Sequence, residues 1–211
     1  MYFRLLAWIG LAVLPAGAVT VLQTEGFGGP TSWQSGGPNP NPPVIVSDAG
    51  PSGAGDFALQ ITATGSGAGG RLVAFDRSVW TGDYLTAGVS GLSVDLSNSS
   101  STDLFIRFAF NGAGGWFTTS ELSLTAGSGW VTNLFDVSTG SLESAGGSDA
   151  AATMSGVTEV RIIDAATADF HGDNVSAVLF VDNIQAVPEP AVGMLAMAGL
   201  ALAGRRRRIQ R

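Results

Sequence analysis

The chain has 211 residues, among them 30 glycines but no cysteine and no lysine, and its formal net charge at pH 7 is −7. Without cysteine it forms neither disulfides nor thiolate metal sites, and without lysine it cannot carry the phosphate-binding lysine of a P-loop. The length between two unusual ends suits one domain with its own hydrophobic core.

The first eighteen residues have the composition of an export signal. Arg4 supplies a positive start, residues 5–14 form an apolar stretch, and Ala16 and Ala18 frame an A-x-A cleavage sequence. We therefore expect residues 1–18 to form a signal helix that signal peptidase removes after Ala18. The alternative is an N-terminal helix that is buried in the domain.

Residues 19–186, the expected domain, are strongly acidic once both ends are set aside. They contain four arginines and sixteen carboxylates, which gives a formal charge of −12. Nucleic acid and anionic membrane surfaces need cationic contacts, so the charge argues against both as partners of the domain. The charge favours solubility and is compatible with divalent cations.

Apolar and polar residues of the domain alternate with period two, a pattern that is typical of half-buried β-strands. The clearest alternation involves Phe57, Leu59 and Ile61; Leu92, Val94 and Leu96; Leu104, Ile106, Phe108 and Phe110; Val160 and Ile162; and Val175, Ala177, Leu179 and Val181. Weaker strands are expected over residues 44–46, 72–75, 116–118 and 131–135. About nine short strands between Gly-rich turns predict an all-β fold, an antiparallel jelly-roll β-sandwich.

Two local patterns suggest catalysis but lack the context that catalysis needs. Residues 65–70 fit G-x-G-x-x-G, yet a predicted strand follows in place of the helix that a dinucleotide site requires, so we interpret them as a hairpin loop. His171 is the single histidine and could form a hydrolase triad with Asp169 or Asp173. No G-x-S-x-G sequence is present to supply the serine, so a solvated loop histidine is favoured and no catalytic residue is predicted.

Aromatic side chains beside polar ones in loop-like segments are the simplest equipment for binding sugars. Trp80, Asp83 and Tyr84 share one such segment, and Trp116 follows a Gly-rich turn. An aromatic ring offers an apolar face to a sugar while polar groups fix its orientation. We predict these four residues as the glycan-binding set. The alternative is that the aromatic rings are half-buried edge or core residues.

A resemblance covers the body of the chain. Residues 25–27 (Glu-Gly-Phe), then Trp33, and residues 181–184 (Val-Asp-Asn-Ile) in the last predicted strand are similar to galactose-binding-like jelly rolls, a pattern that carbohydrate-binding modules share. In such domains the early acid and the last-strand aspartate often flank a structural Ca²⁺. The resemblance therefore implies Glu25 and Asp182 as a metal pair, although a fold does not determine a ligand.

The tail, residues 187–211, has three distinct parts. Residues 187–190 read Val187, Pro188, Glu189, Pro190; residues 191–204 are uncharged; and a basic block follows at Arg205, Arg206, Arg207 and Arg208. Fourteen helical residues extend about 21 Å, less than the roughly 30 Å of a bilayer core, so this short hydrophobic helix crosses only with help from its flanks. The arginines are expected to stay cytoplasmic as a stop, which places the domain outside. The alternative is an apolar core helix with a basic end.

The order of these parts resembles the PEP-CTERM sorting signal of Gram-negative bacteria. In that family a membrane transpeptidase, exosortase, recognises the tail and removes it during delivery to the cell surface. The resemblance implies that Val187 to Pro190 are substrate and that the membrane contact is transient. It also implies a bacterium that makes extracellular polysaccharide.

Together these features predict an exported cell-surface or extracellular-matrix protein that is not an enzyme and associates with exopolysaccharide. Signal peptidase and exosortase are its expected processing partners. Two alternatives stay open: a structural or adhesive subunit without a defined ligand, and a secreted hydrolase.

Overall fold

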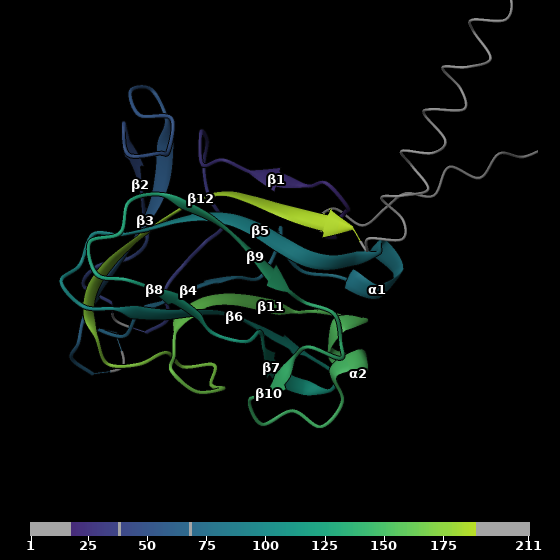
Figure 1. Cartoon of the computed structure of the whole chain (residues 1–211). Coiled ribbons are helices and arrows are strands. Elements are labelled where there is room, and N and C mark those ends of the chain that lie inside the picture. Colours follow the sequence, from purple (N-terminus) through teal and green to yellow (C-terminus); the bar gives the residue numbers. More distant parts are fainter. Residues whose placement is uncertain (1–17, 38, 68, 189–211) are drawn as a thin grey trace, which may run out of the picture.

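The structure is a computed structural model that describes residues 18–37, 39–67 and 69–188 (Figure 1). The predicted signal helix before Ala18 lies outside the described residues. The predicted tail from Glu189 to the end, with its apolar segment and the block of four arginines, lies outside them too.

Two antiparallel sheets face each other and form a sandwich, with the first sheet uppermost in Figure 1. The first sheet has the order β2 (Val44–Ser47), β3 (Phe57–Thr64), β12 (Ser176–Pro188), β5 (Val89–Asn98) and β9 (Val131–Asp136), and β1 (Thr24–Glu25) also pairs with β12. The second sheet has the order β10 (Glu143–Ser144), β7 (Gly115–Thr118), β6 (Leu104–Gly112), β11 (Glu159–Asp164) and β4 (Val73–Asp76), and β8 (Leu122–Leu124) also pairs with β6. The predicted all-β antiparallel sandwich is therefore confirmed.

The core lies between the sheets and consists largely of the residues that the period-two pattern selects. Alternate side chains of five strands point inward because successive residues of a strand face opposite sides of its sheet. The fully buried ones include Leu59, Ile61, Leu92, Val94, Leu96, Leu104, Ile106, Phe108, Phe110, Val160, Ile162, Leu179 and Val181. Burial of this apolar set is the main favourable term for folding, at about 25 cal/mol per Å².

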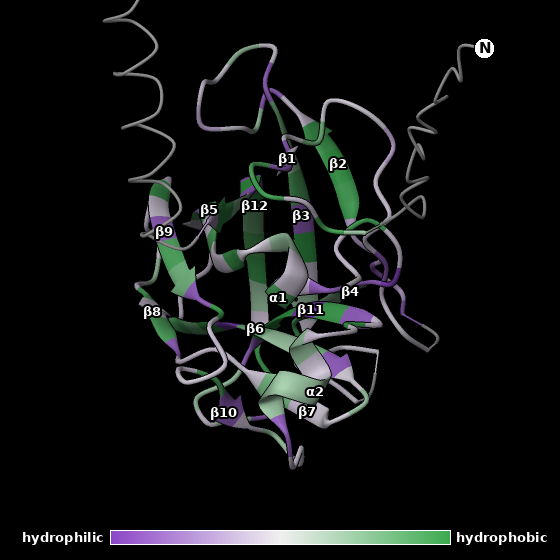
Figure 2. Cartoon of the chain, turned by 90° about the vertical axis from the view of Figure 1, so that its right-hand side faces the viewer, coloured by the Kyte–Doolittle hydropathy of each residue, from purple (hydrophilic) through white to green (hydrophobic). Residues whose placement is uncertain are grey.

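Two short helices close one end of the sandwich, the end that faces the viewer in Figure 2. They are α1 (Tyr84–Ala87) and α2 (Ala150–Met154). Each begins after an aspartate that accepts a backbone N–H of the first turn, as N-cap residues do. No helix within the described residues is long and apolar enough to cross a membrane.

The last strand continues two residues beyond the predicted end of the domain at residue 186. Val187 of β12 lies opposite Gly91, and Pro188 lies opposite Val89 after a break in register. Proline is tolerated there because its missing N–H falls at the strand's end. The first two residues of the predicted sorting motif therefore belong to the sandwich.

The glycine-rich segment 65–70 joins two strands, so a dinucleotide-binding helix is ruled out there. It connects β3 of the first sheet to β4 of the second. The segment is closed by hydrogen bonds from the Thr64 and Gly65 amides to the Gly70 carbonyl. The predicted hairpin is therefore corrected to a crossing between sheets, which a period-two pattern alone does not distinguish.

Candidate functional site

Trp80 and Tyr84 lie in the interior, so the prediction that their rings bind a glycan is wrong. Their side chains are 1% and 0% exposed. The Tyr84 hydroxyl donates to the Trp80 carbonyl at 2.8 Å, and its ring packs edge-on against Phe110. Asp83, between the two aromatics, is the N-cap of α1, and its hydrogen bonds from Thr86 hold the pKa of the carboxyl below its usual value. These residues build the end of the sandwich.

Glu25 is engaged by two buried indoles. Its Oε2 atom accepts the Nε1–H of Trp80 at 2.6 Å and the Nε1–H of Trp33 at 3.0 Å. The Oε1 atom accepts the Thr31 hydroxyl at 3.2 Å. This carboxylate therefore satisfies two interior donors that would otherwise lack partners.

Asp182, the other predicted metal ligand, is fully buried in β12. Its Oδ1 atom accepts the Asn183 amide at 2.7 Å, while Oδ2 has no hydrogen-bond partner within the described residues. Burial, with a smaller contribution from the charges of Asp56 and Asp95, raises the pKa of Asp182 to about 6 against the opposing effect of the Asn183 bond. Its orphaned oxygen suits a cation.

The fit to a calcium ion is nevertheless partial. No group of three or more histidine, aspartate or glutamate side chains in the described part of the chain is placed to hold a metal ion. Glu25 is already used by the two indoles. The calcium site at Glu25 and Asp182 stays a prediction, and one of its two residues fits.

Trp116 lies on the outer face of the second sheet, where we define the Trp116 cluster as Trp116, Arg161 and Phe170. The rings of Trp116 and Phe170 stack with their centroids 4.7 Å apart and their planes 5° from parallel. The Arg161 guanidinium lies 4.4 Å from the Trp116 centroid and 5.6 Å from that of Phe170. Both rings are half-buried, so they keep part of their surface for an external contact.

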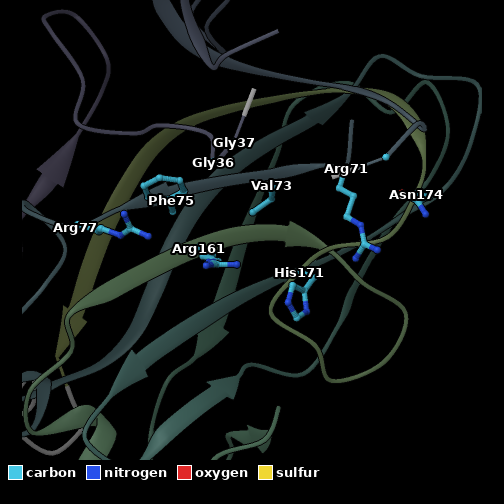
Figure 3. Close-up of a pocket in the computed structure, with 10 residues that line it drawn as sticks. Gly36, Gly37, Arg71, Val73, Phe75, Arg77, Arg161, His171 and Asn174 are labelled. Atoms are coloured by element: carbon cyan, nitrogen blue, oxygen red, sulfur yellow. The ribbon is translucent and has the colours of Figure 1, made fainter. Parts of the chain in front are cut away.

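A pocket of about 480 Å³ continues from this cluster along the same face (Figure 3). Arg77 and Phe75 lie toward one end in this view, Arg71, His171 and Asn174 toward the other, and Arg161 between them. The full lining is Gly36, Gly37, Gly67, Arg71, Val73, Phe75, Arg77, Arg161, His171 and Asn174, and it includes no carboxylate. We call this the arginine pocket.

Glu159 holds two of the pocket's arginines in place from β11. Its side chain is 7% exposed, and its two oxygens accept Nε–H of Arg77 at 2.8 Å and Nε–H of Arg161 at 2.6 Å. Arg161 also donates to the Phe170 carbonyl at 2.6 Å. Arg77 lies over the ring of Phe75, 4.3 Å from its centroid. One carboxylate thus orients two guanidinium groups.

The segment between β11 and β12 forms the other wall and is fixed by Arg71, whose Nη1 donates to the Gly172 carbonyl at 3.0 Å. His171 is exposed in this wall, and its Nδ1 lies 3.1 Å from Oδ1 of Asp169. Bonds from Phe170 and His171 lower the pKa of Asp169, although its partial burial acts in the opposite direction. His171 thus pairs with one of the two carboxylates that the hydrolase interpretation considered, and within the described residues it has no serine hydroxyl as a partner.

Comparison with known proteins identifies the architecture. No protein-family model matches the sequence, and no curated protein matches it either. Among solved structures, a family 11 carbohydrate-binding module of the cellulosomal cellulase Lic26A-Cel5E of Clostridium thermocellum is 15% identical, with a TM-score of 0.51, over 82% of this chain and 97% of the module. A structure of an exo-beta-agarase is 13% identical, with a TM-score of 0.55, over 79% of this chain and 25% of the agarase. At these identities the similarity shows the fold alone, a jelly-roll β-sandwich.

Proposed function

We propose that this chain is a non-enzymatic polysaccharide-binding protein of the cell surface or extracellular matrix. The observation that carries the proposal is the position of the Trp116 cluster beside the arginine pocket, together on the outer face of one sheet. An apolar ring surface next to fixed hydrogen-bond donors is the combination that a sugar requires, since one side of the sugar ring is apolar and its rim carries hydroxyls.

The chemistry of the face supports the binding of a sugar. Arg161, Arg77 and Asn174 present donors for hydroxyl oxygens, and Phe170 and Trp116 present ring surface. Two of the solved structures that share this fold are a module named as carbohydrate-binding and an agarase. Both names agree with a glycan ligand.

We further propose that the protein is exported and sorted by exosortase. The support is the order of parts at the two ends: the A-x-A sequence ending at Ala18, the Val-Pro-Glu-Pro sequence at residues 187–190, the apolar segment 191–204 and the arginine block. The body of the protein would then work outside the cell, where extracellular polysaccharide is available.

A glycan array tests the binding function directly. The full-length protein, purified in mild detergent, should bind at least one class of polysaccharide. Trp116→Ala should weaken that binding about tenfold, because ring stacking contributes on the order of 1 kcal/mol in addition to the area that it buries. Trp130→Ala is the matched control, since Trp130 is also half-buried but lies against Phe180 on the other sheet.

Two results would contradict the proposal. Absence of binding to every glycan, together with concentration-dependent self-association, would favour the structural or adhesive subunit. An equal loss of binding in Trp116→Ala and Trp130→Ala would show that the outer face of the second sheet is not the site.

Sorting is tested separately by expression with and without an exosortase. Mass spectrometry of the exported protein should find an N-terminus at Val19 and, only with the enzyme present, loss of the segment after residue 190. Glu189→Ala should leave the tail attached. Retention of the tail in both strains would overturn the sorting proposal while leaving the glycan proposal standing.

A further inference from the structure

The arginine pocket concentrates positive charge on a domain that is otherwise acidic. Residues 19–186 contain only four arginines against sixteen carboxylates. Three of the four, Arg71, Arg77 and Arg161, line this one pocket, and no carboxylate lines it with them. Positive charge is thus gathered in one pocket of a domain whose formal net charge is strongly negative.

The arginines of the pocket are incompletely neutralised. Glu159 is shared between Arg77 and Arg161, so one negative charge serves two guanidinium groups. Within the described residues, Arg71 donates to the neutral Gly172 carbonyl and forms no ion pair. Arg107 differs, since it is buried and pairs with both Glu121 and Glu143. Positive charge is therefore left available inside the pocket, while the fourth arginine is fully committed to the fold.

The remaining lining suits a ring with a charged substituent. Val73 and Phe75 give the pocket an apolar surface, and Asn174 and His171 add polar groups near Arg71. The volume of about 480 Å³ falls within the roughly 300–1,000 Å³ that is typical of small-ligand sites. A guanidinium binds carboxylate and sulfate oxygens through paired N–H groups, with shorter and stronger bonds than neutral donors make.

We infer that the arginine pocket selects an anionic sugar unit of a polysaccharide, with the carboxylate or sulfate group of the sugar on Arg71 and the ring against the neighbouring Val73. The inference deepens the proposed polysaccharide-binding function and rests on it. A uronic acid and a sulfated sugar share this chemistry, and the experiment separates them.

The acidic remainder of the domain does not prevent such binding. The interaction of exposed charges is largely screened beyond a Debye length of about 8 Å at physiological ionic strength, whereas contacts inside the pocket are screened less. Nearby acids use their oxygens locally: Asp169 accepts the Phe170 amide, and Asp173 accepts the Ala166 amide. An extended nucleic acid depends on many phosphate contacts in a row, which three arginines gathered in one pocket do not provide.

Affinity electrophoresis of the full-length protein in detergent tests the inference. The probes are a polyuronate, a sulfated polysaccharide, a neutral mixed-linkage β-glucan and a single-stranded DNA. Wild-type protein should prefer one of the two anionic polysaccharides to the neutral one. Arg71→Ala should weaken that binding at least tenfold, because it removes the charge-assisted hydrogen bonds to the anionic group, and should weaken binding of the neutral glucan much less.

Two further variants make the outcome specific. Arg71→Lys keeps the charge but loses the paired donors, so it should recover only part of the affinity. Trp116→Ala should weaken the binding of every polysaccharide in proportion. The folded state of each variant is checked by its thermal unfolding midpoint.

The results distinguish this inference from the proposed function. If neutral and anionic glycans bind alike and Arg71→Ala changes nothing, the anionic preference is wrong and glycan binding stands. If no polysaccharide binds, the proposed function fails and the preference fails with it. DNA binding as strong as that of the polysaccharides, and equally dependent on Arg71, would show a general anion site and overturn the inference.

Discussion

The carboxylate of Glu25 accepts the indole N–H of Trp80, 55 residues further along the chain, at 2.6 Å. Trp80 is 1% exposed, so its N–H has no access to solvent and depends on this acceptor. The same oxygen accepts the indole of Trp33. One acidic residue in the first strand therefore joins two interior tryptophans from separate loops, and its negative charge strengthens both bonds.

Replacing Glu25 by alanine should destabilise the fold. Two buried indole N–H groups would lose their acceptor, and each unsatisfied donor costs about 1–3 kcal/mol. We expect the unfolding free energy of Glu25→Ala to fall by about 2–4 kcal/mol. Denaturation by urea, followed by tryptophan fluorescence, measures the change.

Glu25→Gln is the control for shape in that experiment. It keeps one acceptor oxygen and should lose about half as much stability. If a chelator lowers the stability of the wild type as much as Glu25→Ala does, Glu25 acts through a metal ion and the indole explanation is wrong.

The strands and the core could be predicted from the sequence because period-two alternation is local. Leu92, Val94 and Leu96 sit within one strand, and their spacing alone indicates that they share a face. The burial of Trp80 and Tyr84 could not be read in this way. Their segment lacks alternation, and it is covered by elements that are distant in sequence, such as β1 with Glu25.

The arginine pocket was missed for the same reason. Its lining comes from four separated segments, around Gly36, around Gly67 to Arg77, at Arg161 and at His171 to Asn174. The one local signal is the scarcity of arginine in an acidic domain, because each of the few arginines is then expected to have a specific structural or binding role. The turn context of Trp116 is the local feature that predicts it as a binding residue, and the structure places it on the outer face of the second sheet.

Gly172 lies between two residues that line the arginine pocket, His171 and Asn174, in a conformation that glycine alone adopts easily. Its φ is +74°, and a Cβ atom there would lie 2.7 Å from the Leu72 carbonyl oxygen. The left-handed conformation costs other residues about 1–2 kcal/mol, and the contact with the backbone adds to this. Gly172→Ala should therefore lower the unfolding free energy by about 2 kcal/mol or more.

The same variant should disturb the site, because the Gly172 carbonyl is the acceptor for Arg71. Binding of polysaccharide should weaken together with stability. Gly140→Ala is the matched control, since no atom lies within 4 Å of a Cβ at that position. If both substitutions change the denaturation midpoint equally, the backbone argument for Gly172 does not hold.

Arg107 should contribute more to the unfolding free energy than Arg71 does. The side chain of Arg107 is 3% exposed and pairs with Glu121 and Glu143, each at 2.8 Å. It also donates to the Thr119 and Ala165 carbonyls. Removal of one member of a buried ion pair costs about 3–5 kcal/mol.

We expect Arg107→Ala to lose about 3 kcal/mol, the lower end of that range, because its two glutamates are nearly half exposed and water can solvate them. Arg71→Ala should lose about 1–2 kcal/mol, since it gives up one hydrogen bond to an uncharged carbonyl and no ion pair. Chemical denaturation of the two variants side by side measures both losses of unfolding free energy, and similar losses would contradict this prediction.

The buried carboxyl of Asp182 should make the protein more stable at mildly acidic pH. Burial raises its pKa to about 6 from a model-peptide value of 3.8. Because the folded state binds this proton more tightly than the unfolded state does, the stabilisation is present at low pH and is lost as the pH rises through 6. Between pH 5 and pH 7.5 the loss from this group amounts to about 1.4 kcal/mol.

Asp182→Asn removes that titration without changing the shape of the side chain. The difference in unfolding free energy between variant and wild type should shift in favour of the variant by about 1.4 kcal/mol from pH 5 to pH 7.5. Asp136→Asn is the opposite control. Partial burial acts to raise the pKa of Asp136, but hydrogen bonds from Ser138 and Ser141 outweigh it, so the net effect is a lowered pKa. The effect of Asp136→Asn on the unfolding free energy should stay constant between pH 5 and pH 7.5 and diminish only below pH 4.

Calcium can be examined in the same series. If an ion binds the free oxygen of Asp182, adding calcium at pH 7.5 should stabilise the wild type and not Asp182→Asn, and the difference between pH 5 and pH 7.5 should shrink, because the ion replaces the proton. A pH-independent difference between Asp182→Asn and the wild type, with or without calcium, would show that the side chain is solvated and that its burial does not control its ionisation.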